Sequence, residues 1–284
     1  MTKNRFQRPS HPRPKDRPFR PSNDPSQQKF KLFVEYEGTR YSGWQVQQNA
    51  RTVQGEIMAA CHTLFQTADF EVYGSGRTDA GVHALEQIAH LSVKTMLAPH
   101  IIRMKLNYEL PADINIIGVE KAPRDWHARH DAVARTYLYQ ISRRRTALGK
   151  RFVWWIKDDL DLALMQEAAN LFVGMKDVRS FTADDPEEKS TKVHIEQLSL
   201  VPCGDLILIR VGGSHFLWKL VRQIVGVLAE VGRGKLSLND VRHFLSSDSD
   251  APAKFTAPPS GLFLEKVHYK NDPPIGPVKP VMNF

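Results

Sequence analysis

The sequence predicts an α+β fold in which two ferredoxin-like halves, each with the element order βαββαβ, form a central antiparallel sheet flanked by helices. Two observations support this prediction. Segments of alternating apolar residues are interspersed with segments of apolar residues at helical spacing, and the order of these segments is the same in both halves of the chain. Two such half-sheets can pair edge to edge, which leaves a cleft between the halves.

The first half begins with a strand at residues 30–36, because Phe30, Leu32, Val34 and Tyr36 alternate with mostly polar neighbours. A helix is predicted at 53–65, where apolar residues recur every three or four positions. Short strands are expected near 70–75 and 88–93. A helix over about 99–107 and a strand at 114–119 complete this half.

The second half repeats this order. A strand is predicted around Tyr137 and Tyr139, then a helix over 161–173 that ends at Gly174, and strands near 193–201 and 206–211. A long helix over 217–231 follows. A short added helix begins at Ser237, with Asp240 as its capping-box partner, and the last strand covers 262–269.

Composition and element order together predict four parts of the chain, which are residues 1–29, 30–128, 129–271 and 272–284. Residues 1–29 form a basic tail with eight Lys/Arg, two Asp and six Pro, which is too poor in apolar residues to fold. The tail serves either as a phosphate-attracting arm or as a solubilising extension. The two ferredoxin-like halves follow, and a loosely held tail with prolines at 273–280 ends the chain.

Several classes of protein are not expected. No run of 18 apolar residues and no apolar leader occurs, so neither a membrane span nor a secretory signal is predicted. Cys61 and Cys203 are far apart and give neither a disulfide framework nor a zinc spacing. The histidines, among them His90 and His127, are not spaced as metal ligands. We expect a cytoplasmic protein without a metal.

The most informative segment is the glycine-flanked loop 74–84, which presents Arg77 and Asp79 two residues apart between two predicted strands. An arginine can hold a carboxylate ionised and oriented. A dinucleotide fingerprint fails here because Asp79 stands where the third glycine is needed, and a phosphate-binding P-loop fails because Val82 stands where the lysine is needed. No nucleotide cofactor is therefore predicted. A plain hairpin whose Asp caps its own turn is the structural alternative.

The stretch from Gly74 to Ala84 resembles the signature of the TruA family of tRNA pseudouridine synthases. Further blocks agree with this family in order along the chain, at 36–45, 52–55, 107–114, 126–129, 135–139, 216–226 and 257–262. The resemblance extends from about residue 30 to about residue 269. It implies the same two-halved fold, with an RNA cleft between the halves.

The resemblance also implies an activity, namely isomerisation of uridine to pseudouridine in the anticodon stem-loop of tRNA at positions 38 to 40, by a homodimer. The reaction rearranges one nucleoside internally, so no cofactor is expected. Asp79 matches the catalytic Asp. Attack on C1′, attack on uracil C6 and a glycal route all remain open for it.

The other site residues follow from matched positions, except Lys219, which lies one turn before Arg222. Arg77 is expected to contact phosphate or help extrude the base, rather than to form a salt bridge within its loop. Arg222 is expected to pair with Asp79, with a solvated helix-face Arg as the alternative, and Lys219 is expected to contact RNA. Tyr137 is expected to stack on the flipped uracil, whereas Tyr139 is predicted to be core.

Two features leave room for other interpretations. Many family members have His or Asn and then Met before the Val-Arg pair, whereas this chain has Trp218, Lys219 and Leu220 there, so its local RNA contacts can differ. The basic run at 143–151 is either a solvated loop or a phosphate contact. The alternative function is a non-catalytic RNA-binding or tRNA-folding protein, which would have no need of Asp79.

Overall fold

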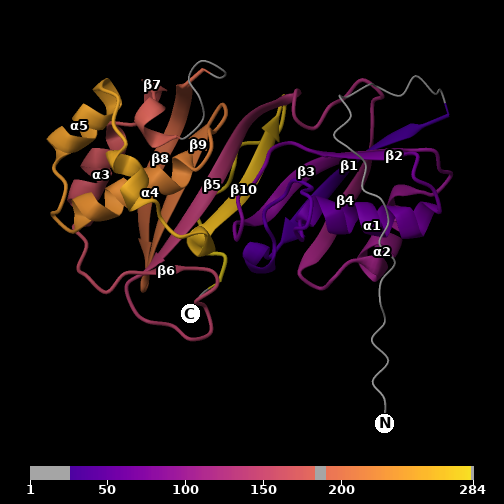
Figure 1. Cartoon of the computed structure of the whole chain (residues 1–284), viewed down its shortest axis with the longest axis horizontal. Helices are drawn as coiled ribbons and strands as arrows, with labels where there is room; N and C mark the ends of the chain where they lie inside the picture. Colours follow the sequence, from indigo (N-terminus) through magenta and orange to yellow (C-terminus); the bar gives the residue numbers. More distant parts are fainter. Residues whose placement is uncertain (1–25, 183–189, 283–284) are drawn as a thin grey trace, which may run out of the picture.

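The computed structural model describes residues 26–182 and 190–282. The basic tail up to residue 25 and the acidic residues 184–188 lie outside the described residues. In the described part, strands join into a single sheet with the path β4-β1-β3-β10-β5-β9-β8-β7, while β2 pairs with β3 and β6 pairs with β5. Helices flank this sheet (Figure 1). The predicted α+β class is therefore confirmed.

Each half has the strand order of a ferredoxin-like unit, β4-β1-β3-β2 in the first and β10-β5-β9-β8 in the second. The elements of the first half are β1 Gln28–Tyr36, α1 Val53–Phe65, β2 Phe70–Gly74, β3 His83–Val93, α2 Pro99–Glu109 and β4 Ile114–Ala122. Those of the second are β5 Ala132–Ser142, β6 Trp154–Trp155, α3 Leu162–Asn170, β7 Gly174–Asp177, β8 Lys192–Cys203, β9 Leu206–Gly213, α4 Leu220–Gly232, α5 Leu238–Ser246 and β10 Leu262–Tyr269.

The two half-sheets join through β3 and β10. These strands run parallel over a short register in which Phe263 faces His83 and Leu264 faces Ala84. The end of β3 pairs with β2 instead, from Ala89 to Val93. Strand β3 therefore serves both halves. It begins five residues earlier than the predicted strand at 88–93, because its first residues pair with β10 on one side and with Tyr36 and Val34 of β1 on the other.

The prediction differs from the structure in four further elements. Helix α3 ends at Asn170 rather than at 173, and Gly174, with φ 95°, is the first residue of β7. Strands β6 and β7 were not predicted, since two and four residues are too short to give a period. Helix α4 begins at Leu220 rather than at 217, because Lys219 adopts a left-handed backbone with φ 60°. The capping box of α5 is confirmed, since Ser237 and Asp240 exchange side-chain and backbone hydrogen bonds.

Buried residues form one large cluster in each half. In the first half, Phe30 and Leu32 of β1 and Ile57 of α1 are fully buried together. In the second, Ile209 of β9 and Ile224 of α4 belong to the corresponding cluster. Figure 1 shows α1 and α2 beside the first group of strands and α3, α4 and α5 beside the second. The chain thus has two cores under one continuous sheet.

The C-terminal segment is held more firmly than predicted. Val281 N–H donates to Gln140 Oε1 at 2.8 Å, and the carbonyl of Gly276 accepts from Arg210 at 2.7 Å. Val278 and Val281 also pack against a third apolar cluster around Phe263. Arg210 is only 3% exposed. Its buried guanidinium needs the carbonyl of Gly276 as well as its ion pair with Glu265. Proline content alone does not reveal this requirement.

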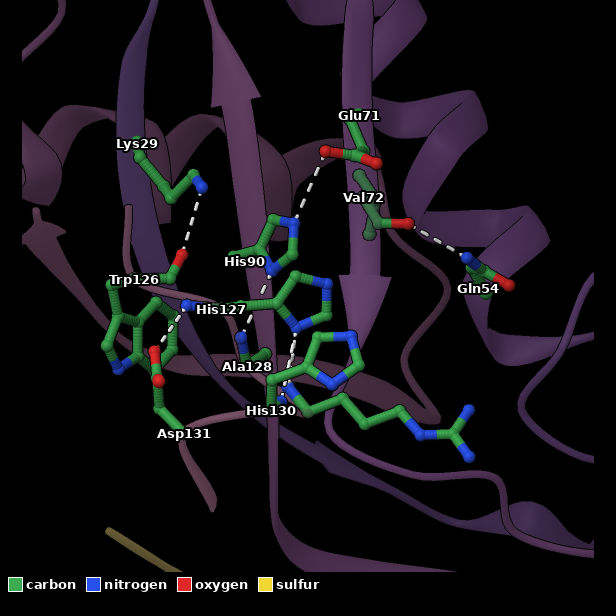
Figure 2. Close-up of polar contacts among 11 residues, drawn as sticks. Lys29, Gln54, Glu71, Val72, His90, Trp126, His127, Ala128, His130 and Asp131 are labelled. Carbon is green, nitrogen blue, oxygen red and sulfur yellow. Dashed lines mark hydrogen bonds and ion pairs between the residues drawn. The ribbon is translucent and has the colours of Figure 1, made fainter. Parts of the chain in front are cut away.

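The linker between β4 and β5 crosses the sheet and is pinned to it (Figure 2). Lys29 of β1 donates to the carbonyl of Trp126 at 2.9 Å, and the Ala128 N–H donates to Nδ1 of His90 at 3.2 Å. His90 Nε2 therefore carries the ring proton and faces Glu71 Oε2 at 3.3 Å. The block at 126–129 thus fixes the connection between the halves.

The described residues contain neither a membrane-spanning helix nor a cluster of metal-binding side chains. In residues 26–182 and 190–282, no helix is long and apolar enough to cross a membrane. Over the same ranges, no group of three or more His, Cys, Asp or Glu side chains is arranged to hold a metal ion, although the rings of His90 and His127 lie 4.7 Å apart. These rings stack with aromatic neighbours and accept backbone N–H groups instead.

Candidate active site

The loop that carries Asp79 connects β2 to β3 and is fixed at its base by hydrogen bonds. Ser75 N–H donates to the carbonyl of Ile88 at 2.7 Å, and its hydroxyl donates to Gln87 Oε1 at 2.7 Å. The amide of Gln87 donates in turn to the carbonyl of Gly76 at 3.1 Å. The loop is therefore held from β3 before it reaches Arg77, which limits the positions open to Asp79.

A second segment supports the loop from the other side. The Trp44 N–H donates to the carbonyl of Thr78 at 3.1 Å, and the Thr78 hydroxyl shares a 2.8 Å hydrogen bond with the phenol of Tyr36. A Cβ added to Gly43, whose φ is 92°, would lie 2.5 Å from the Thr78 carbonyl oxygen. A Cβ on Gly38 would lie 1.9 Å from the carbonyl oxygen of Val82. These glycines let the block at 36–45 touch the backbone of the Asp79 loop.

Asp79 and Arg222 form an ion pair across the two halves, with Nη1 to Oδ2 at 3.2 Å. The side chains are 23% and 13% exposed, respectively. Arg222 Nε also donates to the carbonyl of Ala257 at 2.8 Å, and the Ala257 N–H returns a bond to the Arg222 carbonyl at 3.0 Å. The guanidinium is thus oriented by the backbone before it meets the carboxylate. The solvated alternative for Arg222 does not fit this geometry.

Tyr137 lies on β5 and meets the ring of Phe216 edge-on, with centroids 5.1 Å apart. Burial raises the pKa of Tyr137 to about 12, against a smaller lowering by the Arg135 guanidinium, and the carboxylate of Asp79 raises it further. The phenol is therefore neutral at physiological pH. Tyr139, two residues on, is fully buried and donates to the carbonyl of Pro258 at 2.8 Å, which confirms the prediction that it is core.

Arg135 is a site residue that sequence reasoning missed. Its guanidinium donates to the carbonyls of Ser75 at 3.0 Å, Ser214 at 3.2 Å and Arg129 at 3.3 Å. Burial lowers the pKa of Arg135. One signal was present in the sequence, since alternate residues of a strand share a face and Arg135 precedes Tyr137 by two. Its acceptors, such as the carbonyls of Ser75 and Ser214, are distant in sequence and come near Arg135 only in the folded chain.

Arg77 and Lys219 take no part in the ion pair between Asp79 and Arg222. The Arg77 side chain is exposed and, within residues 26–182 and 190–282, makes no ion pair, so the salt bridge considered for its loop is not found there. Lys219 precedes α4 rather than lying on it, and its ammonium lies 4.2 Å from the ring centre of Trp218. Arg77 is thus exposed to solvent, whereas Lys219 is partly buried and lies over the Trp218 ring.

The arrangement brings the partly exposed carboxylate of Asp79 next to the fixed guanidinium of Arg222, near the neutral phenol of Tyr137. Such a carboxylate can act as a nucleophile or a base. An aromatic ring beside it can carry a planar ligand by stacking. These are the groups that a reaction on a nucleobase needs, and they come from both halves of the chain.

Comparison with known proteins identifies the family of this chain. A family model described as tRNA pseudouridine synthase matches residues 32–131 and 168–270. A tRNA pseudouridine synthase A from Rhodopseudomonas palustris (strain BisA53) is 40% identical over 245 residues, covering 85% of this chain and 99% of the relative. One from Thermodesulfovibrio yellowstonii is 36% identical over 252 residues, covering 84% and 99%.

Among solved structures, a Cbf5-Nop10-Gar1 complex matches with a TM-score of 0.32 at 10% identity, covering 70% of this chain and 54% of that one. That likeness is too weak to support an argument. The family model matches parts of both halves and includes the Asp79 loop and α4, and the relatives cover about 85% of this chain. The resemblance and the prediction of an isomerase are thereby confirmed, and the chain belongs to the TruA family of tRNA pseudouridine synthases.

Proposed function

We propose that this protein isomerises uridine to pseudouridine in the anticodon stem-loop of tRNA, at positions 38 to 40, with Asp79 as the catalytic carboxylate. The observation that carries the proposal is the Asp79–Arg222 ion pair at 3.2 Å, formed between the two halves beside Tyr137. We further propose that the enzyme acts in the cytoplasm as a homodimer, on tRNA bound in the cleft between its halves.

The reaction breaks the N1–C1′ bond of uridine, turns the uracil and joins C5 to C1′. The hydrogen on C5 leaves as a proton, and N1 gains one, so atoms and charge balance without an added reactant. Asp79 starts the sequence, either by attack on C1′ or on C6 or as the base of a glycal route. Arg222 supports each of these routes, because its guanidinium is held by Ala257 and keeps Asp79 oriented.

Extrusion of the base and its retention require further groups. A target inside a stem-loop must leave its stack to reach a carboxylate between the halves. Tyr137 offers a ring for the extruded uracil, and its neutral phenol adds no charge to the pocket. Arg77, which is exposed two residues before Asp79, is in a position to hold the phosphate of the extruded nucleotide.

A non-catalytic RNA-binding role fits the ion pair poorly. A carboxylate in a phosphate-binding cleft weakens binding, and a protein that only bound RNA would have no use for Asp79. Nor would it need Arg222 fixed by two contacts to Ala257 and one to Asp79. These contacts favour the enzyme.

The test uses tRNA transcripts that carry tritium at uridine C5, which is released to water when pseudouridine forms. The purified protein should release tritium without added metal or nucleotide, and Asp79→Asn should bind tRNA but release none. Sequencing of the product should place the modified base at positions 38 to 40. Binding by the parent without release would support the RNA-binding alternative instead.

A further inference from the structure

The segment between β9 and α4, residues 214–219, places an unusual pair of side chains at the rim of the candidate active site. Phe216 packs on Tyr137, and Arg222 in the first turn of α4 pairs with Asp79. Trp218 lies two residues from Phe216, so their Cα atoms are at most about 7 Å apart. Trp218 is therefore close along the chain to a ring that contacts Tyr137.

Trp218 exposes a large aromatic surface at this position. Its side chain is 49% exposed, although indole is among the costliest side chains to leave in water. The ammonium of Lys219 lies 4.2 Å from the centre of its ring. The ammonium lies over one face of the ring, and the exposed part of the ring can carry a base whose phosphate meets the ammonium.

The backbone of Lys219 adds an independent observation. Among residues 26–182 and 190–282, four non-glycine residues have a positive φ. Asn49 and Asn271 are of a type that tolerates this region, and Gln66 caps the end of α1. Lys219 is neither, since it precedes a helix. Backbone strain of this kind persists where the surrounding structure imposes it, and it concentrates at ligand sites.

We propose that Trp218 and Lys219 form a stacking site for an unpaired base that neighbours the target uridine, with Lys219 contacting that nucleotide's phosphate. The inference rests on the proposed function, because it assumes an RNA substrate whose target base reaches Asp79. It assigns a second nucleotide contact outside the pocket of Tyr137. This contact would help to hold the strand while the target base is extruded.

The experiment measures RNA binding in an Asp79→Asn background, so that no turnover occurs. The probe is a synthetic anticodon stem-loop RNA. The chain has five tryptophans. The fluorescence emission of the Asp79→Asn protein minus that of the same protein with Trp218→Phe therefore isolates the Trp218 signal. We expect the RNA to quench that difference signal. We expect Trp218→Ala to raise the Kd by about 5- to 150-fold, the range for loss of one base stack, and Trp218→Phe to keep most of the affinity.

Trp155 provides a matched control. It is 43% exposed and has the guanidinium of Arg145 at 5.9 Å, yet it lies on β6 and not beside Arg222. Trp155→Ala should leave the Kd within about twofold, well below the loss of a base stack. Lys219→Gly accepts the left-handed backbone without strain and removes the ammonium. It should lower the slope of log K against log salt by about 0.7 to 0.9, whereas Trp218→Ala should leave that slope unchanged.

The outcomes separate this inference from the proposed function. One outcome is that the unmutated protein releases tritium from tRNA, while Trp218→Ala in the Asp79→Asn background neither weakens RNA binding nor changes the melting curve. In that case the stacking site is wrong and the enzyme stands. An unquenched difference signal would overturn the inference in the same way. If the parent binds RNA through Trp218 but releases no tritium, the stacking site stands and the activity is wrong. If the parent binds no RNA, both are wrong.

Discussion

The guanidinium of Arg135 on β5 donates to the carbonyl oxygen of Ser75 at 3.0 Å, and this contact ties the second half of the chain to the start of the Asp79 loop. Arg135 also donates to the carbonyl of Ser214, which begins the segment leading to α4. The loop is thus joined to the second half at two points, by Arg135 at its base and by Arg222 at Asp79. Both points are cationic, and both are oriented by backbone carbonyls.

We predict that Arg135→Lys lowers kcat for tritium release by about 10- to 100-fold, because a misplacement of about 1 Å at a reacting group costs on that order. Lysine keeps the charge but cannot reach three separate carbonyls from one planar group. The Kd for tRNA should change much less than kcat. Equal losses in kcat and in binding would instead indicate a general disruption, and an unchanged kcat would contradict a positioning role.

The Asp79–Arg222 pair should behave as one unit in stability measurements. We predict a coupling free energy of about 1–3 kcal/mol in a double-mutant cycle of Asp79→Asn and Arg222→Gln, read from urea unfolding. Each single change leaves a partly buried polar group without its partner, whereas the double change leaves two neutral amides. Additive losses would show that the two side chains meet without a net interaction.

Gly38 and Gly43 should be required for the position of the Asp79 loop. We predict that Gly38→Ala destabilises the protein by about 1–3 kcal/mol and lowers tritium release, because the added Cβ would meet a backbone oxygen at 1.9 Å that no side-chain rotation can clear. Gly276→Ala is the matched control, since nothing lies within 4 Å of its Cβ position. Its melting temperature should equal that of the parent. A Gly38→Ala variant as stable and active as the parent would refute the close approach.

Much of this site could be expected from the sequence, for identifiable reasons. Strand and helix periods revealed the doubled βαββαβ order, and the block around Asp79 pointed to Arg222 as its partner. Arg135 was missed because a lone Arg on a strand gives no sign of its acceptors, which lie up to 79 residues away in the chain. The early start of β3 was missed because its first residues pair with β1 and β10, and both strands are far away in sequence.

The start of α4 was misjudged for a different reason. Leu217 and Leu220 lie at helical spacing, so the pattern extends the helix through Lys219. Only the left-handed φ of Lys219 reveals that the helix has not yet begun. Trp218, the residue before it, is 49% exposed, so the misplaced element boundary falls in the segment on which the proposed stacking site depends.

The imidazole of His127 gives the last prediction, a loss of stability in mild acid. Its Nδ1 accepts the N–H groups of Arg129 at 3.1 Å and of His130 at 3.3 Å in the linker drawn in Figure 2. Burial, and then the neighbouring rings of His90 and His130, lower the pKa of His127 from 6.5 to about 4. The folded chain therefore holds this ring neutral, whereas the unfolded chain protonates it below pH 6.5.

Because the unfolded state binds the extra proton, the free energy of unfolding should fall as the pH drops from about 6.5 to about 4 and then level off with respect to this group. Burial also lowers the pKa values of His83, His215 and His268, which adds to the fall. His127→Asn keeps an acceptor at the place of Nδ1 but does not titrate. Urea midpoints across this range should decline less steeply for His127→Asn than for the parent, and parallel profiles would rule out a contribution from His127.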